Sequence, residues 1–147
     1  MIVGYRHDDG TVEEVSAGDL SALEAQAVEE ATGSAWQEIE QKLREKDPTA
    51  MRAIIWAGRR REDQALDFET FDLPQAGRRL RVGFERYEID ELLTATLENS
   101  LAKNEDQSLE LAQQYLRNSA YHRADVDAAL EALGKGHLAR RPPESAS

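Results

Sequence analysis

The chain has 147 residues, which fits one domain or one domain with a second small lobe. It contains no cysteine, so disulfides, thiolate metal sites and a cysteine nucleophile are excluded. The formal net charge of −11 disfavours non-specific binding to nucleic acid or anionic lipid, because both attract basic surfaces.

The start of the chain predicts a β-hairpin. Two strand-like runs, Ile2 to Arg6 and Thr11 to Val15, flank Asp9-Gly10, a strong signal for a tight turn. A two-stranded hairpin is marginally stable, so a third strand is expected. In Arg79–Glu85 apolar residues alternate with charged residues or glycine, which is typical of a half-buried strand. We expect it to join the hairpin; the alternative is that this stretch continues into the following helix.

Two helices are predicted next. The first begins after Asp19 or Ser21 as its cap and ends at Gly33, the usual residue after a helix C-terminus. The second begins at Ser34, and Gln37 stands at the position that completes a capping box. Helices joined by so few residues are expected to pack as antiparallel or steeply crossed neighbours.

Residues 47–61 predict a central, buried helix. Asp47 is a good N-cap, and Pro48 stands at the first helical position. The helix is apolar on nearly all sides and includes Trp56. Only Arg52 interrupts its apolar run. Its apolar run is far shorter than the roughly 20 residues that span a membrane. Arginines 59–61 suit the negative end of the helix dipole, and we expect local ion pairs rather than nucleic-acid contacts.

The next segment carries only acidic charges until Pro74. Asp67 is expected to cap a single helical turn that places Phe68 and Phe71 against the three helices. Negative charge is concentrated before Pro74, which predicts an N-terminal unit of residues 1–74.

Three amphipathic helices are predicted in the second half. Their apolar stripes run from Ile89 to Leu101, from Leu109 to Leu116 and from Val126 to Leu133. They form a C-terminal lobe of residues 75–134, which Gly134 closes. Residues 135–147 offer little to bury and are predicted to be a disordered tail. The fold class is therefore α+β, predominantly α: helical units with a small antiparallel hairpin or three-stranded sheet.

No residue is predicted to be catalytic, to bind a cofactor or to ligate a metal. His7, His122 and His137 lack the spacing of a metal site. His122 and Asp125 could meet on one helix face, but no nucleophile accompanies them. We therefore predict a protein that is not an enzyme and uses no cofactor.

Residues 106–134 have the outline of a helix-turn-helix, which leaves a small DNA-binding regulator as one alternative. The second helix carries Asp125, Asp127 and Glu131 and no basic residue between Ala124 and Leu133. A helix that reads a DNA groove normally has the opposite charge, so no nucleic-acid partner is predicted.

An ordered set of short motifs lies within residues 2–73. It comprises a TG…W step between two helices, a D-P-x-A…A-x-x-W-x-x-R-R helix and an L-x-F-E-x-F-D segment. The matching residues are Thr32, Gly33, Trp36, Asp47, Ala50, Ala53, Trp56, Arg59, Arg60, Leu66, Phe68, Glu69, Phe71 and Asp72. In order and spacing, this half of the chain resembles the tail assembly chaperones of long-tailed phages, especially those of actinobacterial hosts.

The resemblance implies an acidic, mostly helical protein that acts in the host cytoplasm and is absent from the mature virion. Such chaperones bind the tape measure protein, keep its apolar helices soluble and recruit tail tube protein. Many of them self-associate, so a homo-oligomer is expected, and no membrane partner is expected. Residues 75–147 are either an extension of the kind made by ribosomal frameshifting or a family-specific lobe.

A chaperone for apolar helices needs an apolar groove that is occupied reversibly. Two regions are candidates: the helices around the tryptophans and the stripe of the helix containing Leu92–Leu101. The predicted partner-binding residues are Trp36, Trp56, Phe68, Phe71, Leu93 and Leu97. The alternative functions are a structural virion or head–tail connector subunit, another oligomeric adaptor, and the helix-turn-helix regulator.

Overall fold

The computed structural model describes residues 1–103 and 106–139 and divides the chain into two units, with the division after Gly83. The first unit contains β1 (Ile2–Arg6), β2 (Val12–Ser16), a 3-10 turn (Ala17–Asp19), α1 (Ala22–Thr32), α2 (Trp36–Arg44), α3 (Pro48–Arg59), α4 (Ala76–Arg79) and β3 (Leu80–Gly83). The second contains α5 (Arg86–Lys103), α6 (Asp106–Ser119) and α7 (Arg123–Ala139). The predicted fold class, α+β and predominantly α, is confirmed.

The predicted sheet is confirmed as three antiparallel strands in the order β2-β1-β3. Val3 in the central strand is opposite Val15 on one side and Val82 on the other. At the hairpin turn Gly10 takes a φ of 86°, and the carboxylate of Asp9 accepts a 2.9 Å hydrogen bond from the backbone N–H of Thr11. Gly at positive φ and Asp as a turn acceptor are the reasons this dipeptide favours hairpins.

The boundary between the two units lies after Gly83 and not near Pro74, where it was expected. β3 follows Pro74 in sequence but pairs with β1, and the hydroxyl of Tyr5 donates a 2.8 Å hydrogen bond to the carbonyl of Pro74. The unit boundary follows the need of the hairpin for a third strand.

The expected end of the last helix is also corrected. α7 continues through Gly134 to Ala139, so residues 135–139 are helical rather than part of a disordered tail. A Cβ added at Gly134 would meet nothing within 4 Å. A helical glycine costs only about 1 kcal/mol relative to alanine, which neighbouring helix-forming residues offset. The remainder of the predicted tail, residues 140–147, lies outside the described residues.

The first helix begins after Ser21, one of its two predicted caps, whereas the second does not begin as predicted. The hydroxyl of Ser21 accepts a hydrogen bond from the N–H of Glu24, and Glu24 completes the capping box of α1. The expected capping box at Ser34 is absent, because α2 begins at Trp36 without a side-chain cap of its own. The carboxylate of Glu29, at the end of α1, instead accepts the N–H of Trp36 at 2.9 Å.

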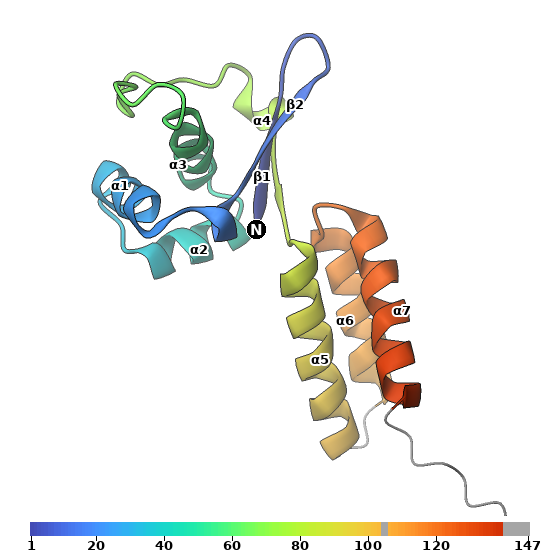
Figure 1. Ribbon diagram of the computed structural model, residues 1–147. Coiled ribbons are helices and arrows are strands. Elements are labelled where there is room, and N and C mark those ends of the chain that lie inside the picture. Colours follow the sequence, from blue (N-terminus) through green and yellow to red (C-terminus); the bar gives the residue numbers. More distant parts are fainter. Residues whose placement is uncertain (104–105, 140–147) are drawn as a thin grey trace, which may run out of the picture. The chain divides into compact units, whose positions relative to one another are not determined.

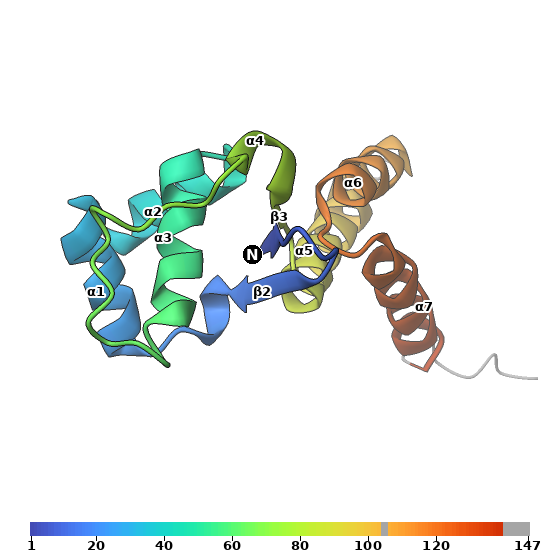
Figure 2. The ribbon, with the colours of Figure 1, turned by 90° about the horizontal axis from the view of Figure 1, so that it is seen from above.

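Helix α3 lies between the sheet and α1, as both ribbon views show (Figures 1 and 2). Its start is the predicted one, because the Asp47 carboxylate accepts the N–H of Ala50 at 3.0 Å. Ile54 and Ile55 are completely buried, and Trp56 is 5% exposed. The core of the first unit is therefore built around α3. In the second unit α5, α6 and α7 lie side by side (Figure 1).

Gly58 marks the closest approach of α3 to the sheet. A Cβ added there would lie 2.6 Å from Cγ2 of Val15, a β-branched side chain that cannot turn away freely. We predict that Gly58→Ala destabilises the first unit by about 1–3 kcal/mol, because overpacking outweighs the helix propensity of alanine. Denaturant unfolding measures this through tryptophan fluorescence, since Trp36 and Trp56 both lie in this unit.

A double-mutant cycle identifies the cause of that loss. Val15→Ala should cost less free energy in the Gly58→Ala background than in the wild-type chain, because it removes the methyl groups that the new Cβ meets. A Gly58→Ala variant as stable as the wild type would show that this contact does not limit the packing.

Candidate partner-binding site

The aromatic residues predicted to bind a partner lie mainly in the core of the first unit. The rings of Trp56 and Phe68 meet edge to face with centroids 5.3 Å apart, and the Trp56 Nε1–H donates to the Leu66 carbonyl at 3.0 Å. Phe68 and Phe71 are each less than a tenth exposed. The N–H of Phe71 donates to the Asp67 carbonyl, which closes the single turn predicted for this segment. Trp56 is 5% exposed.

Arg52 fixes this segment on α3. Its Nη1 donates 2.7 Å hydrogen bonds to the carbonyls of both Phe68 and Phe71. Its guanidinium lies 3.9 Å from the ring centroid of Phe68. A charged donor to two carbonyls combined with a cation–π contact is a strong local restraint. The one charge in the apolar run of α3 therefore has a structural role that sequence reasoning did not assign.

Two of the three arginines at the end of α3 form ion pairs, but not with the acidic segment that follows the helix. Arg59 binds both oxygens of Glu13 on β2, at 3.0 and 2.9 Å. Arg61 binds both oxygens of Glu24 on α1, at 2.6 and 3.2 Å. The expectation of local ion pairs is therefore wrong in the identity of the partners. Arg59 and Arg61 join α3 to elements that are distant in the sequence, which only the fold reveals.

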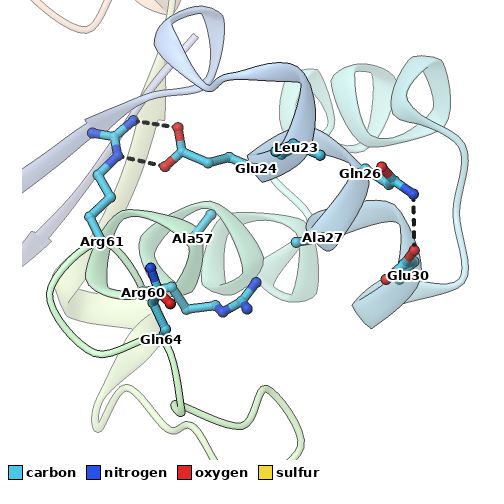
Figure 3. Close-up of a pocket in the computed structure, with 9 residues that line it drawn as sticks. All are labelled: Leu23, Glu24, Gln26, Ala27, Glu30, Ala57, Arg60, Arg61 and Gln64. Carbon is cyan, nitrogen blue, oxygen red and sulfur yellow. Dashed lines mark hydrogen bonds and ion pairs between the residues drawn. The ribbon is translucent and has the colours of Figure 1, made fainter.

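A groove of about 530 Å³ runs between α1 and the end of α3 (Figure 3). We call it the Arg60 groove; its lining residues are Leu23, Glu24, Gln26, Ala27, Glu30, Ala57, Arg60, Arg61 and Gln64. It shares Ala27, Glu30 and Arg60 with a second hollow of about 350 Å³, whose other lining residues are Ala31, Trp56, Leu66, Asp67, Phe68 and Glu69. Leu23 at its margin is 78% exposed.

A second groove, of about 420 Å³, lies between α5 and α7 within the second unit. We call it the leucine groove; its lining residues are Arg86, Asp90, Leu93, Thr94, Leu97, Glu98, Leu101, Ala129, Ala132 and Leu133. Leu93 is buried at its base, Leu97 is half-buried, and Leu101 is 65% exposed. Arg86 and Asp90 are paired with each other at 3.1 Å, so they bring no unpaired charge to the groove.

The predicted partner-binding residues are therefore divided among three places. Leu93 and Leu97 meet in the leucine groove. Trp56, Phe68 and Phe71 belong to the core of the first unit. Trp36, at the start of α2, is half-buried and lines neither of the grooves described above.

Sequence reasoning missed two features of these grooves. The α7 side of the leucine groove, Ala129 to Leu133, was visible only as a helix stripe, because the pairing of α7 with α5 is a tertiary contact. For Arg60, the sequence indicates only a place in a helix terminus, because nothing in the run of arginines distinguishes it from its neighbours.

Among the residues that the structure describes, no group of three His, Asp or Glu side chains is placed to hold a metal ion. None of the helices in the same ranges combines the length and apolarity needed to cross a lipid bilayer. Comparisons of the chain with protein-family models, curated proteins and solved structures returned no match. Its function therefore has to be inferred from its own chemistry and from the motif resemblance.

The Glu24–Arg61 pair gives a test of how α1 and α3 are joined. The Arg61 guanidinium, followed by the backbone N–H of Ser21, lowers the pKa of Glu24 from 4.5 to about 2. The native state thus keeps Glu24 ionised at a pH where the unfolded chain protonates it. The contribution of this pair to the free energy of unfolding is therefore fully present above pH 4.5 and is lost as the pH falls towards 2.

We predict that Glu24→Gln, which retains a capping-box side chain, lowers the free energy of unfolding by up to about 1 kcal/mol near neutral pH. The small value reflects the half-exposed Arg61 side chain. Urea unfolding at a series of pH values should show the two proteins converging between pH 4.5 and about 2. A difference that stayed constant over this range would mean that the charge of Glu24 does not contribute.

Proposed function

We propose that this protein is a non-enzymatic tail assembly chaperone of a long-tailed phage. It binds apolar helices of the tape measure protein in the host cytoplasm, helps to recruit tail tube subunits and is absent from the mature virion. Two things support the proposal: the ordered motifs of residues 2–73, and an open apolar groove on a bundle of three helices. The leucine groove is the observation that carries it.

The leucine groove has the chemistry of a site for an amphipathic helix. Leu93, Leu97 and Leu101 follow one another at four-residue intervals along α5, so they form one continuous stripe. Ala129, Ala132 and Leu133 of α7 form the opposite wall, and the two alanines leave room for a large side chain of the partner. Helix-in-groove binding uses such stripes, which accept a partner's apolar residues at matching spacing.

The exposure of this stripe supports reversible occupancy rather than a permanent core. Leu101 is 65% exposed, and Leu97 is half-buried. Leaving such side chains in water forgoes about 1.5–3 kcal/mol of burial energy per residue, which becomes available when a partner helix covers them. The net charge of −11 adds repulsion between loaded complexes, which opposes their aggregation.

Co-expression with a tape measure fragment tests the proposal. The wild-type chain should co-purify with the fragment and increase the soluble share of it. Leu101→Asp should weaken binding by about tenfold or more, because a charge replaces a side chain that the partner buries. Co-purification and titration of the purified complex both measure this loss.

Leu111→Asp is the matched control. Leu111 lies on α6 in the same unit, is 66% exposed and does not line the groove. It should bind the fragment as the wild type does. An insoluble, unbound fragment in the presence of wild-type chain would refute the proposed function, and equal losses from both variants would refute the groove as its site.

A further inference from the structure

Although the protein is acidic, Arg60 has no counter-ion among the residues that the structure describes. Its Nε is buried and has no hydrogen-bond partner, and within the described part of the chain its side chain makes no ion pair. Its neighbours Arg59 and Arg61 are both held by carboxylates. Acidic residues outnumber basic ones by 29 to 18, so the chain does not lack carboxylates for it. The fold leaves this guanidinium unpaired although acceptors are abundant.

The carboxylates around Arg60 have other roles. Glu24 is bound to Arg61, and Glu30 accepts a 3.2 Å hydrogen bond from Gln26 (Figure 3). Asp67 caps the turn after α3 by accepting the N–H of Glu69 at 3.4 Å. In Figure 3 no dashed line reaches Arg60, whose side chain extends towards the side of the groove that Ala27 and Glu30 form. These acids make an acidic margin without neutralising Arg60.

The guanidinium of Arg60 packs against an aromatic ring that is itself held in place. It lies 4.8 Å from the ring of Trp56, and Trp56 is itself fixed by its hydrogen bond to the Leu66 carbonyl and its contact with Phe68. A stacked, planar guanidinium with free donors is suited to binding a carboxylate, because little side-chain freedom is lost on binding. Leu23, exposed at the margin, adds an apolar contact.

We propose that the Arg60 groove is a docking site for a peptide segment of a partner protein that carries one carboxylate. The carboxylate accepts hydrogen bonds from the guanidinium of Arg60, and an apolar residue beside it packs on Leu23 and Ala27. Basic residues at the edges of the segment meet an acidic margin formed by Glu30 and, in the adjoining hollow that also contains Arg60, by Asp67 and Glu69. A segment with several acidic residues is excluded by that margin.

This site lies in the first unit and is separate from the leucine groove in its residues and chemistry. The proposal stands whether or not the leucine groove binds a tape measure helix. It gives the chaperone a second contact that is selective for charge, whereas the leucine groove selects for apolar surface.

Selection from a displayed library of random 12-residue peptides tests this without prior choice of a ligand. Peptides selected on the full chain should share one Asp or Glu next to an apolar residue, with Lys or Arg farther out. A synthetic copy of a selected peptide should bind at least about tenfold more tightly than its Asn or Gln counterpart, as expected for a charge-assisted hydrogen bond.

Arg60→Gln should abolish the preference between the acidic peptide and its amide counterpart. Arg44→Gln is the matched control, since it makes the same charge change at an arginine of α2 paired with Glu40, outside the groove. Circular dichroism verifies that both variants fold. The proposal fails if no peptide is enriched, if enriched peptides lack the acid, or if Arg60→Gln binds the acidic peptide as the wild type does.

Discussion

Helix α3 has almost no solvent-facing side of its own, and the rest of the first unit is arranged to cover it. The sheet covers one side, where Gly58 allows β2 to approach; α1 covers another; and the 66–73 segment covers the ring of Trp56. Arg52 makes this last contact possible by binding two carbonyls of that segment. Covering an apolar helix thus determines where the hairpin, α1 and the acidic segment lie.

The same constraint places the arginines at the end of α3. Arg59 and Arg61 lie between elements that already pack on the helix, so each finds a carboxylate from β2 or α1. Arg60 lies beside Trp56, where the covering elements leave a groove rather than an acceptor. The unpaired guanidinium is therefore a consequence of the packing around α3.

Features that depend on neighbouring residues could be predicted from the sequence. The Asp9-Gly10 turn and the Asp47–Pro48 helix start each need only a few adjacent positions. Ser21 was one of two candidate caps for α1, and the structure selects it. The pairing of β3 with the hairpin was also predicted, from the alternating pattern of its residues, but most features that depend on distant contacts were not. The cap of α2 comes from Glu29 in the preceding helix, and the end of α7 is not set by its glycine.

The candidate site divides in the same way. Leu93 and Leu97 were predicted from the periodicity of α5, and they do lie in a groove. The second wall from α7 and the unpaired state of Arg60 follow from tertiary packing, which no spacing of residues encodes. The aromatic residues could not be assigned from the sequence. A buried core residue such as Phe71 and an exposed aromatic residue that contacts a ligand can occur in the same sequence pattern.

We propose that an apolar helix of the tape measure protein binds between α5 and α7. Hydrogen exchange of the full chain, with and without a soluble tape measure fragment, tests it most directly by locating the protected amides. Protection should increase in α5 around Leu97–Leu101 and in α7 around Ala129–Leu133, because a bound helix suppresses local opening there. Unchanged exchange in both segments, with protection confined to other elements, would contradict the account.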